Sequence, residues 1–118
     1  MDTVSKKTLV RILTRAKNIL IRNKWTKRTY AKDPHGFWVE PQSPDACQFC
    51  MAGAILLAAD QIQENADKHL LLGYANEYIR EITGNPYATL INYNDKHTTT
   101  KKEAVAILSD ITAHYKKE

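Results

Sequence analysis

Apolar residues recur with helical spacing near both ends of the chain. Between Ser5 and Asn23, intervals of three and four residues predict one amphipathic helix. Its apolar stripe consists of Leu9, Ile12, Leu13, Ala16, Ile19 and Leu20. Near the C-terminus, Thr100 followed by Glu103 has the capping-box pattern, which predicts the start of the last helix. The positions of that helix that we expect in the core are Val105, Leu108, Ile111, Thr112 and Tyr115.

A third helix is predicted in the middle of the chain. The tripeptide Ser43-Pro44-Asp45 supplies an N-cap residue, a proline for the first helical position and an acid for the first turn. We therefore expect a helix from Ser43 to about Glu64, and its many apolar and small residues favour a buried central position. Gly53 costs this helix about 1 kcal/mol of propensity, which the close approach of another backbone or of a ligand would explain.

The next periodic segment predicts a fourth helix from about Asp67 to Thr83. It ends at Gly84, a residue type that commonly follows the last turn of a helix. From Tyr87 to Asp95 the pattern is lost, and we expect an irregular or briefly extended segment.

A turn is predicted between the N-terminal helix and the central helix, where Asp33-Pro34-His35-Gly36 has the residue types of a β-turn. Residues 29–32 and 37–40 flank it and are candidates for a short β-ribbon. The length of 118 residues suits one domain. The predicted fold is therefore a mainly α, four-helix single domain with a possible short β-ribbon between helices one and two.

Composition narrows the cellular setting. No apolar run is long enough for a membrane span, and the N-terminus lacks the apolar segment of a signal peptide. The chain has two cysteines, Cys47 and Cys50, which suggests no disulfide framework. We expect a cytoplasmic protein without membrane contact, in the host cytoplasm if a phage encodes it.

Positive charge is concentrated at the start of the chain. Residues 1–32 contain ten lysines and arginines and one acid, giving +9, whereas residues 33–118 contain seven bases and twelve acids, giving −5. At 100° per residue, four bases of the first helix fall within a sector of about 80°, opposite the apolar stripe. They are Lys7, Arg11, Arg15 and Arg22. This ridge predicts an anionic partner, although helices also carry solvated bases without any partner.

Cys50 is the candidate nucleophile. With His97 downstream it follows the Cys-then-His order of cysteine hydrolases. In a helix starting at Ser43, however, Cys50 lies beyond the first turn that lowers a thiol pKa, and we expect both Cys50 and Gly53 to face the core. The sequence offers neither a second cysteine pair for zinc nor a redox cysteine at a helix start, so we expect no metal and no cofactor.

Several further residues are candidates for binding. Asn94 and Asp95 are either ligand contacts or braces that cap backbone amides near the last helix. Trp25 and Trp38 are either core residues or, with Tyr30, surfaces on which a base could stack.

These residues also carry a family resemblance. The chain resembles a family of small proteins of unknown function from bacteria, prophages and phages. The matching residues are Ile12, Leu13, Ala16, Ile19, Trp25, Ala31, Asp33, Gly36, Val39, Pro41, Ala46, Phe49-Cys50-x-x-Gly53-Ala54-Ile55, Asn94-Asp95, Thr99 and Val105. Tyr93 stands where the family has a tryptophan. The resemblance implies no activity.

We therefore favour a non-enzymatic binding or accessory protein of phage or prophage origin. It would bind an anionic ligand, such as a nucleotide or nucleic acid, or a host protein, through the basic first helix and the turn from Asp33 to Trp38. The alternatives are a small cysteine-dependent hydrolase using Cys50 and His97, and a non-specific nucleic-acid-binding protein. The oligomeric state stays open.

Overall fold

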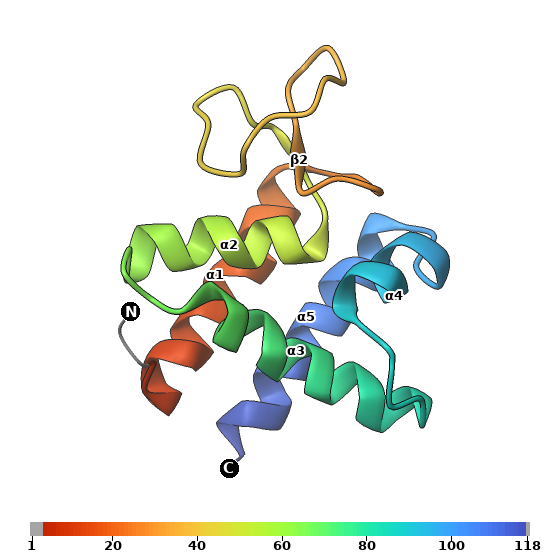
Figure 1. Cartoon of the computed structure of the whole chain (residues 1–118). Helices are drawn as coiled ribbons and strands as arrows, with labels where there is room; N and C mark the ends of the chain where they lie inside the picture. Colours follow the sequence, from red (N-terminus) through yellow and green to blue (C-terminus); the bar gives the residue numbers. More distant parts are fainter. Residues whose placement is uncertain (1–3, 118) are drawn as a thin grey trace.

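The computed structural model describes residues 4–117, which form a helical body with a small sheet at one end (Figure 1). The five helices are α1 (Lys6–Arg22), α2 (Met51–Ile62), α3 (Lys68–Thr83), α4 (Leu90–Lys96) and α5 (Lys101–Lys116). The strands are β1 (Lys24–Trp25), β2 (Ala31–Lys32) and β3 (Gln48–Phe49). The mainly α prediction is confirmed, but the predicted number of four helices is wrong by one.

The additional helix is α4, which lies in the segment predicted to be irregular. Thr89 is its N-cap and accepts a hydrogen bond from the Asn92 amide at 3.1 Å, while Leu90 and Asn94 point into the core. With only seven residues, α4 is too short to show a helical period in the sequence. It is stabilised instead by its tertiary contacts.

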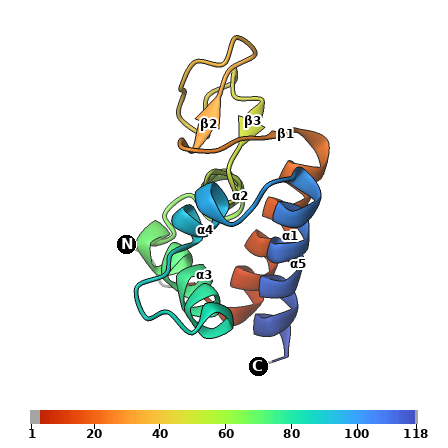
Figure 2. The same ribbon diagram turned by 90° about the vertical axis from the view of Figure 1, so that its right-hand side faces the viewer.

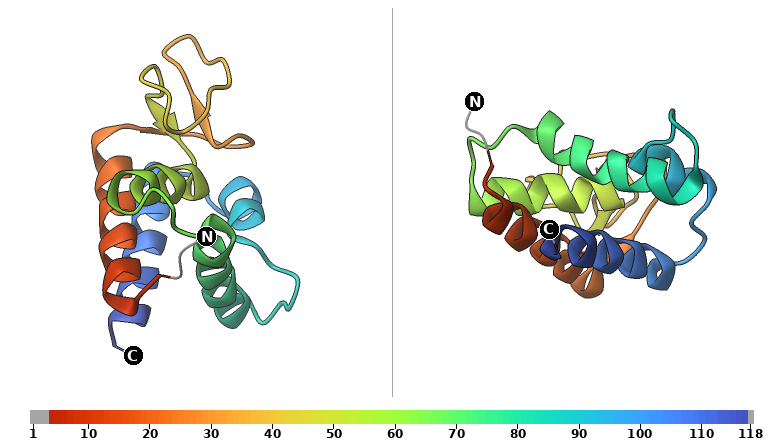
Figure 3. Two further views of the ribbon diagram at one scale, coloured as in Figure 1. Left: turned by 60° about the vertical axis from the view of Figure 1, so that its left-hand side comes forward. Right: turned by 90° about the horizontal axis from the view of Figure 1, so that it is seen from below.

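Helices α1 and α5 pack side by side and run in opposite directions (Figures 2 and 3). Ser5 caps α1 by accepting a hydrogen bond from Thr8 N, and Thr100 caps α5 by accepting one from Glu103 N. Both helix starts were predicted, and all six residues of the α1 apolar stripe are buried. This pair forms one wall of the core, and α2 packs against α1 from within.

The predicted start of the central helix at Ser43 is wrong. Ser43 instead closes a turn, in which its hydroxyl accepts a hydrogen bond from Asp45 N at 3.2 Å. The chain then extends through β3, and α2 begins only at Met51, with Cys50 as its N-cap. Residues 47–50 are extended because their backbone groups pair with two other segments, which outweighs local helix propensity.

The sheet brings three separate parts of the chain together in the order β1-β3-β2. β1 is parallel to the central strand β3, and β2 is antiparallel to it. The predicted β-ribbon is present only as a single bridge between Lys32 and Trp38, next to a hydrogen bond from Val39 N to Ala31 O. β2 pairs instead with β3, a strand that lies inside the segment predicted to be helical. The loop from 33 to 47 projects beyond the helical body (Figure 1).

Gly53 lies where the backbone after β1 touches α2. A Cβ atom at this position would lie 1.9 Å from Tyr30 O, so only glycine fits. The same carbonyl accepts a hydrogen bond from Cys50 N at 3.1 Å. Of the two explanations considered for Gly53, another backbone or a ligand, the structure shows the close approach of another backbone.

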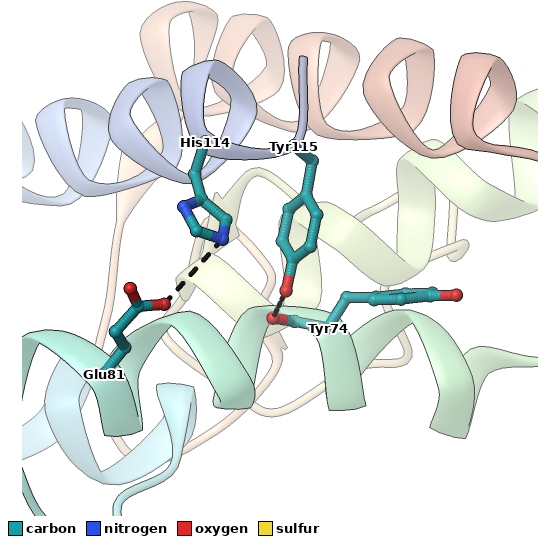
Figure 4. A network of polar contacts seen from close by, with 4 residues as sticks. All are labelled: Tyr74, Glu81, His114 and Tyr115. Atoms are coloured by element: carbon teal, nitrogen blue, oxygen red, sulfur yellow. Dashed lines mark hydrogen bonds and ion pairs between the residues drawn. The ribbon is translucent and has the colours of Figure 1, made fainter. Parts of the chain in front are cut away.

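Helix α3 covers the other side of the core and meets α5 through aromatic residues. Its predicted end is confirmed, because Gly84 is its C-cap in a left-handed conformation with φ 68°. The Tyr115 hydroxyl of α5 donates a hydrogen bond to Tyr74 O, and His114 lies 3.9 Å from Glu81 (Figure 4). These contacts connect the C-terminal helix to α3.

Candidate functional site

Asn94 lies at the junction of the sheet, α2 and α4. Its side chain is completely buried and forms four hydrogen bonds. The Oδ1 atom accepts from the Trp25 indole at 2.8 Å and from Met51 N at 3.0 Å. The Nδ2 group donates to Thr26 O at 3.1 Å and to Asp95 Oδ1 at 3.0 Å. An amide has two donor hydrogens and two acceptor lone pairs, so the side chain is fully satisfied and acts as a brace.

Asp95 follows directly and holds the backbone after β1. Its Oδ1 accepts a hydrogen bond from Arg28 N at 2.9 Å. Arg28 has φ 69°, in the left-handed region that non-glycine residues rarely occupy. Asp95 therefore fixes a strained backbone position from a distant helix. The prediction that this pair bonds to backbone amides is confirmed, but the amides belong to the start of α2 and the loop after β1, not to the last helix.

A pocket of about 370 Å³ opens beside this brace. Its lining residues come from the loop after β1, the turn after β2, the start of α2, and α4. They are Arg28, Thr29, Tyr30, Trp38, Cys50, Ile91 and Asp95. We call this cavity the Trp38 pocket. It combines aromatic walls with one cation and one carboxylate, and its volume lies in the range of small-ligand sites.

Cys50 lies at the edge of this pocket but is not activated. As the N-cap of α2 it is closer to the helix start than predicted, and its Sγ accepts a hydrogen bond from Gly53 N at 3.2 Å. Burial, with a smaller contribution from the negative charge of Asp95, raises the pKa of the thiol from 9.0 to about 11. A thiol with this pKa stays protonated at neutral pH and is a poor nucleophile.

His97 does not lie with Cys50 in the Trp38 pocket. It is the exposed C-cap of α4, its ring lies 5.5 Å from that of Tyr93, and it borders a different hollow near Tyr87. Cys47 also lies apart from Cys50, because the two flank an extended strand and are about 10 Å apart along it, beyond the reach of a disulfide. The arrangement gives no support to a Cys-His pair or to a redox pair.

The basic ridge of the sequence lies on the surface of α1. All four side chains are exposed, and no acidic side chain in the described part of the chain forms an ion pair with any of them. They extend over about 22 Å of helix. We call Lys7, Arg11, Arg15 and Arg22 the basic face of α1.

A polar hollow of about 610 Å³ adjoins this face where α1 meets α2. Arg15 and Arg22 line it together with three amides that offer further hydrogen-bond donors. These amide side chains are Asn18, Asn23 and Gln61. The hollow has the donor chemistry of an anion site.

The remaining predicted site residues fall into two groups. Trp25 is half-buried, donates to Asn94 and has the Lys27 ammonium 5.4 Å from its ring, so its role is structural. Asp33 is structural as well, because its Oδ1 accepts from His35 N and Phe37 N, each at 2.9 Å, and thereby closes the turn. Trp38 is different: 61% of it is exposed, and it forms one wall of the pocket.

No sequence pattern indicated Arg28 or Ile91 as site residues. Arg28 stands in a run of polar residues, and nothing local marks the left-handed conformation that places it beside Asp95. Ile91 belongs to the unpredicted helix α4, is 39% exposed and lines the pocket. Both positions depend on contacts between distant segments.

Residues 4–117 contain neither a cluster of metal ligands nor a membrane-spanning helix. In this range no three histidine, cysteine or acidic side chains are close enough together to hold a metal ion. None of the helices in the same range combines the length and apolarity needed to traverse a bilayer.

Comparison with known proteins identifies one match, to a family model. The chain matches no curated protein and no solved structure. A family model described as a family of unknown function, DUF6197, matches residues 4–114, nearly the whole chain. On that match, this chain belongs to the DUF6197 family.

Proposed function

We propose that the protein is a non-enzymatic binding protein that holds a polyanion on the basic face of α1. The observation that carries the proposal is the set of four exposed bases, aligned along one helix and free of ion pairs with any described acid. Bases that are not neutralised within the protein attract an anionic partner and raise its rate of association.

The length of the basic face favours a polymer over a single anion. A stretch of about 22 Å is several times the size of one phosphate group, whereas a nucleic-acid strand presents phosphates along such a length. The polar hollow beside Arg15 and Arg22 adds donors at one end of the face. Binding through phosphates alone carries no sequence information, so we propose that it is not sequence-specific.

The experiment is a fluorescence-anisotropy titration with a labelled 20-base-pair DNA duplex and the matching single strand, from 25 to 200 mM salt. Affinity should fall steeply with salt, because each phosphate that is neutralised releases condensed cations. The double variant Arg11→Glu/Arg15→Glu should bind at least tenfold more weakly and lower the salt slope by roughly two.

The matched control is Lys102→Glu/Lys116→Glu, which changes the net charge equally at exposed positions of α5. If binding depends on the position of the charges, this control should keep most of the affinity for nucleic acid. If binding depends only on net charge, it should lose as much affinity as the α1 variant. Absence of binding to both nucleic acids at 25 mM salt, or equal losses in the two double variants, contradicts the proposal.

The biological setting is proposed from the sequence resemblance alone. We propose an accessory protein of phage or prophage origin that acts in the bacterial cytoplasm. Ultraviolet crosslinking in bacteria that express the chain should recover nucleic acid with the wild type and much less with Arg11→Glu/Arg15→Glu. Recovery of a host protein and no nucleic acid would contradict polyanion binding and indicate a protein partner.

A further inference from the structure

We propose that the Trp38 pocket binds a mononucleotide, with the base against Trp38, a base amino group on Asp95 and the phosphate on Arg28. This site is separate from the basic face of α1 and does not rest on the function proposed for that face. Its lining residues come from other elements, and none of the four bases of α1 is among them.

The aromatic walls favour a flat ligand. Trp38 exposes 61% of its surface, and the backbone bridge to Lys32 holds it in place. Tyr30 lines the same pocket, and its backbone is held against α2 at Gly53. Aromatic side chains on restrained backbones are suited to stacking a heteroaromatic ring, which contributes about 1 to 3 kcal/mol per base.

Asp95 offers one carboxylate oxygen to a ligand. Its Oδ1 already accepts from Arg28 N and Asn94 Nδ2, while Oδ2 accepts no hydrogen bond from any residue between 4 and 117. The carboxylate is therefore held in place on one side and open on the other. An oxygen in this state suits the exocyclic amino group of adenine, guanine or cytosine, which uracil lacks.

Arg28 supplies the positive charge. Its guanidinium forms no hydrogen bond or ion pair within the described chain, although the residue has a left-handed backbone that glycine would adopt without strain. Arginine at such a position destabilises the fold relative to glycine, and this cost points to a function of the side chain. Guanidinium groups pair with phosphate through two parallel hydrogen bonds.

Other ligand classes leave part of the pocket unused. A purely apolar ligand would bury Arg28 and Asp95 without partners, and a simple cation would lie close to Arg28. A nucleotide combines a ring, an amino donor and an anion in one molecule, which matches all three features of the pocket.

The test is isothermal titration calorimetry with AMP, GMP, CMP and UMP, and with the corresponding nucleosides. The wild type should bind AMP, GMP and CMP more tightly than UMP. Trp38→Ala should weaken nucleotide binding about tenfold, while Trp38→Phe, which keeps an aromatic face, should lose less. Absence of binding to all four nucleotides at millimolar concentration overturns the proposal, as does unchanged affinity in Trp38→Ala.

A second variant separates the ligand role of Arg28 from its place in the fold. Arg28→Gly should lower the affinity for nucleotides about tenfold, leave the affinity for nucleosides unchanged, and raise the melting temperature by relieving the left-handed residue. Equal losses for nucleotides and nucleosides overturn the assignment of Arg28 to the phosphate. The variant Arg11→Glu/Arg15→Glu should keep the wild-type nucleotide affinity, and loss of nucleotide binding there would move the site to α1.

Discussion

The indole nitrogen of Trp25 donates a hydrogen bond to Oδ1 of Asn94 at 2.8 Å, across 69 residues of sequence. The same oxygen accepts the first amide of α2, so one atom joins the sheet, α2 and α4. Asn94 is completely buried, so its side-chain oxygen makes these bonds out of contact with solvent.

Replacement of Asn94 should be among the most destabilising changes in the chain. Asn94→Ala removes the partners of the buried Met51 N and Thr26 O and of the half-buried Trp25 indole, so the free energy of unfolding should fall by about 3 kcal/mol or more. Urea denaturation measures the loss. Asn92→Ala is the control, because this exposed asparagine of the same helix should change stability by less than about 0.5 kcal/mol. Similar losses in the two variants would contradict the bracing role.

Replacing each of two helical glycines with alanine should change the stability of the protein in opposite directions. Gly53→Ala places a Cβ 1.9 Å from the Tyr30 carbonyl oxygen and should cost about 2 kcal/mol or more, despite the gain in helix propensity. Gly73→Ala in α3 meets nothing within 4 Å and should add about 0.5 to 1 kcal/mol. Thermal unfolding of the two variants side by side checks both signs, and a stabilised Gly53→Ala would show that the backbones can separate.

The two cysteines should differ in reactivity. At pH 8 a pulse of iodoacetamide should modify half-buried Cys47 first, because burial holds the pKa of Cys50 at about 11. Mass spectrometry identifies the modified residue, and Cys47→Ser should abolish the fast phase. Since the folded-state pKa of Cys50 is raised above 9.0, its contribution to stability is complete below pH 9 and is lost as the pH rises toward 11.

The cap at Cys50 leads to a related comparison. Cys50→Ala removes the acceptor for Gly53 N and should cost about 1 to 2 kcal/mol, whereas Cys50→Ser keeps an acceptor and should cost less. Urea denaturation compares the two directly. Equal losses would mean that packing of the sulfur, and not capping, determines the residue at this position.

The cap of α5 should make stability depend on pH in the acidic range. A hydrogen bond from Thr99, followed by one from Thr100, lowers the pKa of Glu103 below 4.5. Its stabilisation is therefore present above pH 4.5 and disappears as the pH falls through the lowered pKa. Titration of the carboxylate by nuclear magnetic resonance should show a pKa nearer 4.5 in Thr99→Ala. An unchanged value in that variant would rule out Thr99 as the main cause.

Apolar spacing over about five turns predicted α1 from about Ser5, and the capping-box pair Thr100 and Glu103 predicted the start of α5. The Thr89 cap of α4 is equally local, but the seven residues after it show no helical period. The start of α2 was misplaced because Ser43-Pro44-Asp45 suits a turn as well as a helix start. The choice between them depends on strand partners about 20 residues away.

The candidate sites also divide into features that a local pattern predicts and features that depend on long-range contacts. Helical phase alone grouped the four bases of α1, and residue type alone drew attention to Trp38 and Asp95. The Trp38 pocket as a whole was not predictable. Arg28 is placed there by a hydrogen bond from its backbone N to Asp95, 67 positions away. Ile91 is placed there by α4, which has too few residues to show a helical period. Contacts between residues far apart in the sequence cannot be read from a local pattern.

The position of Asn94 late in the sequence has a consequence for synthesis on the ribosome. Trp25, Thr26 and Met51 emerge before their common partner, with Met51 preceding it by 43 residues. At roughly 5 to 20 residues per second, this interval lasts a few seconds. During it, the sheet and the start of α2 lack the side chain that satisfies their buried polar groups. A chain terminated anywhere before residue 94 therefore cannot complete its N-terminal half, and we expect such fragments to be substrates for chaperones and proteases rather than folded domains.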